Sequence, residues 1–409
     1  MKGHVTSNQS PPLRPSTLRA VPAAIWALGL GSLFMDASSE LVHSLLPVFM
    51  TSVLGASMVT IGFVEGVAEA TASITKIFSG AISDYFGKRK LLVVLGYGLG
   101  AVTKPMFPLA TSVTWVFLGR FVDRIGKGIR GAPRDALVAD VTPPALRGTA
   151  YGLRQALDSV GAFLGPLLAV LLMGRFANDI RTVLWFGVVP AVIAVALLVA
   201  FVREPERHDG EASARTHLTL ATVKRLPRRY WLIVQLGAVF TLARFSEAFL
   251  VLRAQNLGLA VGYIPAVMIA MNVVYAAVAY PAGVVADRFG HRTLLIVGLA
   301  VLVIADVVLA RATAPLHAFV GTAFWGLHMG LTQGLLSKLV ADTAPAALRG
   351  TAFGVFNLVS GVALLLASVI AGALWNAVGP SGTFIAGAGF ALLAMVGLGV
   401  AGRNDGRPR

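Results

Sequence analysis

Two stretches of this sequence decide its fold: residues 80–89, GAISDYFGKR, and residues 283–292, GVVADRFGHR. Each begins with Gly, has Asp at its fifth position, Phe-Gly at its seventh and eighth, and Arg at its tenth. A second pair, ADVTPPALRGTAYG at 139–152 and ADTAPAALRGTAFG at 341–354, recurs at an offset of 202 residues, against 203 for the first pair. Two matches at nearly one offset indicate two related halves in tandem.

The composition is that of a membrane protein. Of the 409 residues, 56% are apolar and only 13% are charged, and none is Cys. Soluble domains carry roughly 25% charged residues. The mean hydropathy of +0.77 argues against a soluble enzyme, a disulfide scaffold and a disordered chain. The net charge of +15 is expected from Lys and Arg in cytoplasmic loops, so we expect no nucleic-acid partner.

The apolar stretches are long and numerous enough for twelve membrane crossings, because a helix needs about 20 residues to span a bilayer. We place them at 24–52, 57–83, 88–109, 112–140, 148–173, 181–202, 231–255, 260–286, 291–311, 315–341, 350–375 and 379–401. The repeat then predicts an all-α integral membrane fold of two pseudo-symmetric six-helix bundles. Parallel repeats of this kind are typical of transporters with a site between the halves.

The polar stretches divide the chain into five parts. These are a tail (1–21), the first bundle (22–202), a linker (203–230), the second bundle (231–401) and a second tail (402–409). With the first tail inside, twenty Lys and Arg fall on the cytoplasmic side. Five fall on the opposite side, namely Lys104, Arg175, Arg181, Arg253 and Arg311. Both termini are therefore predicted to be cytoplasmic, in a bacterial inner membrane.

The loop GAISDYFGKRK at 80–90 resembles the loop signature of the major facilitator superfamily, G-x-x-x-D-x-x-G-[RK]-[RK], and the resemblance extends over residues 22–401. It implies alternating access of two bundles. By the same match, the gating loops hold Gly80, Asp84, Gly87, Arg89, Asp287 and Arg292. We count Arg147, Arg134, Asp135 and Asp140 with the gating region, and for the last three we expect a structural ion-pair network near the cytoplasmic gate.

The fourth crossing is unusually charged, and ionisable residues within a membrane are functional candidates by default. One helical arc, which Asp123 shares, holds five bases, namely Arg120, Arg124, Lys127, Arg130 and Arg134. We expect Arg120, Arg124 and Lys127 to line a substrate cavity that is basic on the first-half side; the alternative is a structural network. The stretch from Arg124 to Gly128 resembles the family's fourth-span pattern R-x-x-q-G, with Lys in place of Gln. In the family this arginine is associated with proton coupling or substrate contact.

Acidic residues in the spans are candidates for carrying protons, because burial and neighbouring bases shift their proton affinity in opposite directions. The proton-coupling candidates are Asp36, Glu40, Glu65, Glu69 and Asp123, with Asp36 and Glu40 ranked first. The alternative for each is a static partner of a base in the fourth span.

Other polar residues complete the predicted substrate cavity. Arg154 and Asp158 are four residues apart and can neutralise each other, and Arg244 and Glu247 lie in the seventh crossing. The less charged second half adds Asn272, Tyr275, His328, Gln333 and Asn357. His43 and His328 are expected to make polar or packing contacts. We expect no metal site and no cofactor, because no ligand-spaced cluster occurs.

These observations predict a monomeric secondary active transporter and not an enzyme. Gly161–Pro166, GAFLGP, resembles the family's antiporter motif in part, which favours export. Its partners would be the lipid bilayer, protons and a small-molecule substrate. The expected function is proton-coupled export of a small amphipathic or anionic organic solute. The alternatives are proton-coupled uptake of an organic anion or metal chelate and a non-transporting protein such as a lipid scramblase.

Overall fold

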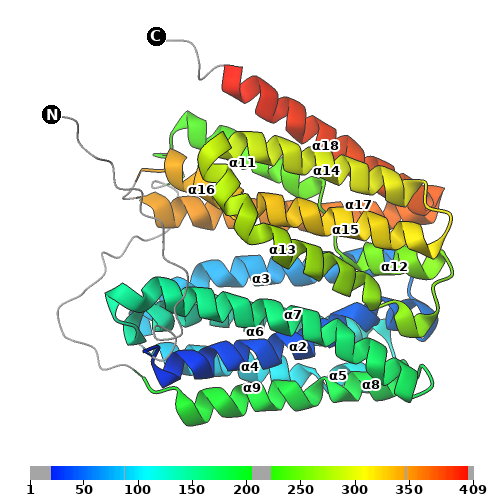
Figure 1. The fold of residues 1–409 in the computed structure, drawn as a ribbon, viewed down its shortest axis with the longest axis horizontal. Coiled ribbons are helices and arrows are strands. Elements are labelled where there is room, and N and C mark those ends of the chain that lie inside the picture. The colour runs from blue at the N-terminus through cyan, green and yellow to red at the C-terminus, as the bar shows by residue number, and fades with distance from the viewer. Residues whose placement is uncertain (1–19, 87, 205–222, 346–347, 404–409) are drawn as a thin grey trace.

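The computed structural model describes residues 20–86, 88–204, 223–345 and 348–403, which fold into helices with no strand among them. The two halves of the chain form two bundles, drawn below and above one another in Figure 1. The first bundle contains α2 (Ala23–Ser52), α3 (Met58–Phe86), α4 (Arg89–Thr103), α5 (Met106–Leu109), α6 (Val113–Val141), η1 (Pro144–Leu146), α7 (Arg147–Arg175), α8 (Ile180–Phe186) and α9 (Val188–Phe201). The second contains α11 (Arg228–Leu242), α12 (Ala248–Asn256), η2 (Val261–Tyr263), α13 (Ala266–Phe289), α14 (His291–Ala310), α15 (Pro315–Thr332), α16 (Leu335–Thr343), α17 (Arg349–Val378) and α18 (Pro380–Arg403).

The predicted twelve crossings are confirmed. Eight are single helices and four consist of two consecutive helical pieces, α4 with α5, α8 with α9, α11 with α12, and α15 with α16. Breaks follow local sequence: Pro105 cannot donate a backbone hydrogen bond between α4 and α5, and Gly334 takes φ +73° between α15 and α16. Seven segments within the described ranges are long and apolar enough to cross a membrane by length and composition alone.

The repeat seen in the sequence is present in the packing. In the first bundle, α4 and α6 cross so closely that a Cβ on Gly126 would lie 2.6 Å from the carbonyl oxygen of Gly96. In the second bundle, α14 and α15 cross at the positions 202 residues later, where His328 Nδ1 donates to the Gly298 carbonyl at 2.7 Å. The two helix crossings are therefore equivalent, with Gly126 in the first bundle at the position of His328 in the second.

The two bundles meet along α3 and α17. Glycines permit the contact: a Cβ on Gly66 would lie 2.9 Å from the side chain of Leu365, and one on Gly62 would collide with the carbonyl oxygen of Ser368. The largest apolar cluster also spans both halves and includes Phe49 and Phe249.

The ends of the molecule differ. We call the end with Glu204 and the α3–α4 and α6–α7 connections the linker end, and the end with the α2–α3 connection, residues 53–57, the opposite end. Hydrogen bonds between described residues join the halves toward the opposite end and at mid-length. Gln255 of α12 accepts from Thr51 at 3.2 Å and donates to Ser52 at 2.8 Å, and Asn272 of α13 donates to the Ala162 carbonyl at 2.9 Å. The bundles are thus latched together at the opposite end.

Some sequence predictions fall outside the described part of the chain. These are most of the first tail (1–19), most of the linker (205–222), the end of the second tail (404–409), Gly87, and the side chains of Asp84 and Asp287.

Candidate functional site

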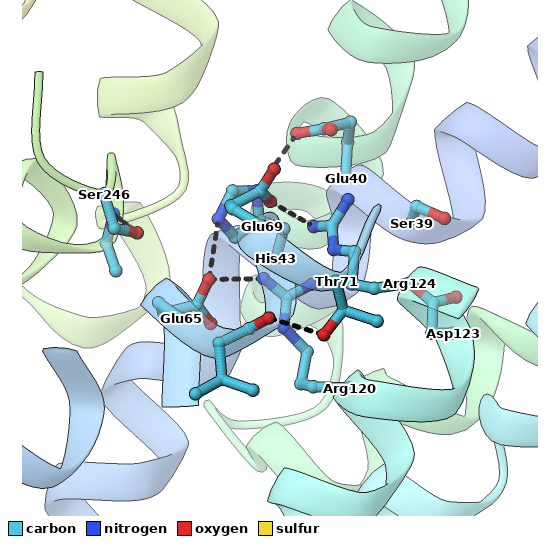
Figure 2. A network of polar contacts seen from close by, with 12 residues as sticks. Ser39, Glu40, His43, Glu65, Glu69, Thr71, Arg120, Asp123, Arg124 and Ser246 are labelled. Atoms are coloured by element: carbon cyan, nitrogen blue, oxygen red, sulfur yellow. Dashed lines mark hydrogen bonds and ion pairs between the residues drawn. The ribbon is translucent and has the colours of Figure 1, made fainter. Parts of the chain in front are cut away.

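The charged face of α6 forms ion pairs with α3, its neighbour in the first bundle. Arg120 pairs with Glu65, and one turn further on Arg124 pairs with Glu69 at 3.1 Å. Both arginines are nearly buried, with 4% and 6% of their side chains exposed. The spacing of four residues on each helix places the two pairs one above the other (Figure 2).

His43 of α2 lies beside the first of these two ion pairs. Its Nδ1 lies 3.7 Å from a carboxylate oxygen of Glu40, and its Nε2 lies 3.8 Å from Oε2 of Glu65 (Figure 2). Glu65 is fully buried and its Oε1 has no partner among the described residues, whereas the Glu40 side chain is 25% exposed. The imidazole therefore stands between an accessible carboxylate and a buried one.

A third ion pair closes the α4 side of α6. Asp123 accepts from the ammonium of Lys104 at 3.0 Å, and both side chains are buried. The assignment of Lys104 to a loop on the opposite side is wrong, because it ends α4 inside the bundle. Arg253 was placed in such a loop too, but it is buried and donates to the carbonyls of Leu309 and Ala312 at the end of α14.

A second network lies toward the linker end. Asp36 is 3.9 Å from Arg130, and Arg154 donates to Asp158 at 2.6 Å, so the predicted internal pair of α7 is confirmed. Asp135 lies between Arg134 and Arg154 at 3.7 and 3.8 Å. Arg130 was not among our site candidates, although its position on the α6 face could have indicated it.

The acids, not the bases, are the exposed members of these networks. Asp36, Glu40 and Glu69 retain 28%, 25% and 29% of their side-chain exposure, whereas Arg120 and Arg124 are buried. Lys127, at mid-length in α6, is the exception: it is exposed and has no carboxylate within 4.0 Å among the described side chains. The basic surface expected on this side is therefore replaced by three accessible carboxylates around one accessible ammonium.

The second-half candidates are more scattered. Arg244 and Glu247 are half-buried in the break between α11 and α12, and Tyr275 and Asn357 are half-buried in α13 and α17. Asn272 joins the bundles, as described above. Two candidates are not together with these: Gln333 is exposed in the α15–α16 break, and His328 is fully buried inside the second bundle.

In the predicted gate region, the start of α4 is held by an ion pair and two hydrogen bonds. Arg89 pairs with Asp140 of α6, and Glu204, just after α9, accepts from the backbone amides of Arg89 and Lys90 at 2.7 and 2.9 Å. This carboxylate at the start of α4 satisfies amides that have no partner within the helix.

The other gate residues have fewer contacts. Arg292 donates to the Gly399 carbonyl at 2.8 Å, a Cβ on Gly80 would meet Ala132 at 3.5 Å, and Arg147 is exposed at the start of α7. No group of three His, Asp or Glu side chains in the described ranges could hold a metal ion.

Comparison with known proteins gives the family. The model of the Major Facilitator Superfamily matches residues 28–252 and 239–408. An uncharacterised MFS-type transporter of Methanocaldococcus jannaschii is 32% identical over 386 residues, covering 92% of this chain and 94% of that protein. A class H tetracycline resistance protein of Pasteurella multocida is 24% identical over 312 residues, covering 71% and 74%.

The fold is also found among solved structures. The crystal structure of a D-xylose–proton symporter superposes with a TM-score of 0.72 at 17% identity, covering 92% of this chain and 96% of that one. The tandem repeat, the twelve crossings and these matches agree, and the chain belongs to the Major Facilitator Superfamily, as a multi-pass membrane transporter.

Proposed function

We propose that this chain exports a small amphipathic organic solute in exchange for protons, with its linker end and both termini in the cytoplasm of a bacterial cell. The observation that carries this proposal is the position of His43 between Glu40 and Glu65, beside the exposed Glu69. The orientation follows from the basic residues. Since Lys104 and Arg253 are buried, Arg175, Arg181 and Arg311 are the bases that remain near the opposite end among the described residues.

The proton pathway would begin at Glu40. This carboxylate is partly exposed, and its one ion-pair partner within 4.0 Å in the described part of the chain is His43. Histidine changes charge near neutral pH, so it can accept a proton delivered through Glu40. Glu65, on the other side of the ring, is held by Arg120 and stabilises the protonated imidazole. Asp36 and Glu69, which are also accessible, are the next candidates; Asp123 is the static partner of Lys104.

The charge of the solute decides the direction of coupling. A cationic group that binds between Asp36, Glu40 and Glu69 competes with protons for the same carboxylates, and competition gives exchange. An anionic group needs a base; protonation of Glu69 frees Arg124, so anion and proton bind together. The three exposed acids therefore favour exchange, in which the proton gradient drives export.

A specific observation also supports a second candidate, proton-coupled uptake of an organic anion or metal chelate. The exposed ammonium of Lys127 has no carboxylate within 4.0 Å among the described side chains and is positioned to receive an anionic group. Among the similar proteins, the P. multocida relative is a tetracycline resistance protein and the structural neighbour is a D-xylose–proton symporter. A lipid scramblase is disfavoured, because it would need neither the latch nor the paired charges.

The test uses purified protein in liposomes with a trapped pH dye. The probes are a quaternary ammonium amphiphile and an aryl sulfonate, whose charges do not change with pH. Under the proposed exchange, the external cation alkalinises the interior as protons leave. Under the second candidate, the external sulfonate acidifies the interior as protons enter with it. Probe movement without a pH change would contradict proton coupling in both.

A matched variant tests the site itself. Glu40→Gln removes the accessible carboxylate with little change of shape, so we expect loss of the pH signal while probe–probe exchange persists. The control is Asp179→Asn at the opposite end, where a hydrogen bond from Thr182 lowers the pKa of Asp179. Asn is as good an N-cap as Asp, so the start of α8 remains satisfied and the pH signal should persist.

A further inference from the structure

A buried carboxyl group in the second bundle lies outside every network described above. Asp306 of α14 is fully buried, and its Oδ1 accepts from Trp325 Nε1 of α15 at 3.0 Å. Its Oδ2 has no partner among the described residues. Gly387 of α18 faces this oxygen, and a Cβ there would lie 2.6 Å from it, so the glycine leaves room for the carboxyl group.

The repeat shows what stands at the same place in the first bundle. Asp306 is 202 residues after Lys104, and Trp325 is 202 residues after Asp123. Both pairs join equivalent helices, span 19 residues and have a donor–acceptor distance of 3.0 Å. In the first bundle this bond is between an ammonium and a carboxylate. In the second, the cation is absent and the donor is a neutral indole.

An ionised Asp306 would therefore be a buried charge without a counter-ion. No Lys, Arg or His nitrogen of the described residues lies within 4.0 Å of it. Of the helices packed on α14, α18 contributes no titratable residue before Arg403, and α13 has Tyr275 as its mid-length one. On α15 the nearest is His328, whose Nδ1 donates to Gly298 and whose Nε2 is unpartnered, which is the arrangement of a neutral ring. Burying an unpaired charge costs far more than leaving one neutral hydroxyl unbonded.

We propose that Asp306 is a second proton-binding site, occupied in this conformation, and that its proton is retained through the transport cycle. The proton takes the role that the charge of Lys104 has in the first bundle, since it neutralises the acid of the equivalent pair. Its neighbours Trp325 and Gly387 belong to the same bundle. Rocking of one bundle against the other leaves these contacts intact, so Asp306 has no route by which to exchange its proton. This inference does not depend on the direction of transport or on the substrate.

The test begins on the purified protein without substrate. Infrared spectra of the wild type and of Asp306→Asn are recorded between pH 6 and pH 9. We expect the wild type to keep, at pH 8, a carboxylic-acid C=O band that Asp306→Asn lacks. Absence of that band would show that Asp306 is ionised and would overturn the proposal.

Stability gives a second readout, with two variants. Asn keeps the acceptor for Trp325 and carries no charge, so Asp306→Asn should melt within a few degrees of the wild type at pH 6. Asp306→Ala, which removes the acceptor, should melt clearly lower at the same pH. As the pH rises to 9, the wild type should lose stability that Asp306→Asn retains, because only the unfolded wild type gains by ionising this group. The same change in stability between pH 6 and pH 9 in the wild type and in Asp306→Asn would contradict the proposal.

A transport assay tests whether Asp306 retains its proton through the cycle. In the liposome assay, Asp306→Asn should keep the wild-type ratio of protons to solute, whereas a ratio lowered by one proton would show that Asp306 releases its proton in the cycle. If no probe is transported by the wild type, the proposed function fails while the infrared and melting results on Asp306 stand.

Discussion

His43 Nε2 lies 3.8 Å from Oε2 of Glu65 and so connects α2 to α3 across the first bundle. The two residues are 22 positions apart in the sequence, on helices joined by a short connection, residues 53–57. Neither motif nor spacing pairs them. Their proximity turns a set of buried acids and bases into a chain that reaches from the accessible Glu40 to the buried Arg120, and the predictions below follow from that arrangement.

Replacing His43 should uncouple proton movement from solute movement. In His43→Gln a polar side chain remains, but no group between Glu40 and Glu65 changes charge between about pH 5 and pH 8. We expect the proton-coupled rate to fall at least about tenfold and to lose its pH dependence in this range, while solute exchange without a proton gradient continues. The assay is the dye-loaded liposome across that pH range.

The control for His43 is His317→Gln. His317 is exposed at the start of α15, where its Nδ1 accepts from the amide of Ala314 at 3.2 Å. It belongs to the second bundle, whereas the charged network lies in the first. Its variant should transport with the wild-type pH profile. An unchanged profile in His43→Gln would exclude the imidazole from the proton pathway.

Lys127 should distinguish a cationic from an anionic solute. Lys127→Gln removes a like charge beside the accessible acids. Two like charges about 8 Å apart repel by about 2 kcal/mol at an effective dielectric near 20, so the apparent affinity for the quaternary ammonium probe should rise roughly thirtyfold. For the sulfonate probe the same change should abolish saturable transport. Lys127→Arg keeps the charge and serves as the control. Weaker binding of the cation to Lys127→Gln would contradict the exchange mechanism proposed above.

Gln255 should hold the opposite end closed. Gln255→Ala removes both of its hydrogen bonds to α2, worth about 2 kcal/mol together, and should shift the population toward states open at that end by about thirtyfold. The chain contains no Cys, so a single Val251→Cys in α12, where Val251 is 1% exposed, reports opening by its rate of thiol labelling without background.

Gln155→Ala is the control for the latch. Gln155 is also a glutamine but is exposed in the linker-end half of α7, so its loss should leave labelling at position 251 unchanged. An equal labelling rate in Gln255→Ala and the parent would show that the two hydrogen bonds do not keep the opposite end closed.

The Lys104–Asp123 pair should be structural. Lys104→Met leaves Asp123 as an uncompensated buried charge, which costs about 3–5 kcal/mol and should lower the melting temperature clearly. Adding Asp123→Asn removes that charge and should recover most of the stability, with proton coupling intact. If the double variant folds but loses coupling, Asp123 carries the transported proton and is not a static partner.

Much of the fold could be predicted from the sequence, because the information is local or repeated. Twelve apolar stretches of 21 to 29 residues predict twelve crossings, and two matched blocks at offsets of 202 and 203 predict two like bundles. The four-residue spacing of Arg154 and Asp158 predicts their contact in the same way, since it places them on one face of one helix. In the candidate site, the charged face of α6 was likewise predictable from its period.

The sequence could not predict which charged residues of different helices pair, because this depends on which helix faces meet in the bundle. The sequence analysis counted Lys104 among the bases on the opposite side, yet the α4–α6 crossing at Gly96 and Gly126 buries it against Asp123. The period of α6 placed its bases on one arc and so predicted a basic surface. In the structure Glu65 and Glu69 of α3 pair with the buried Arg120 and Arg124, and the exposed acids are Asp36, Glu40 and Glu69.

The sequence by itself determined that this chain is a two-bundle membrane transporter, because hydropathy and repetition act along the chain and need no knowledge of contacts. Only the tertiary structure decided which charges are paired, which remain accessible, and that Asp306 stands where Lys104 stands in the other half. The physical reason is that a charge in a low-dielectric interior is governed by its nearest counter-ion, and here that counter-ion lies on another helix.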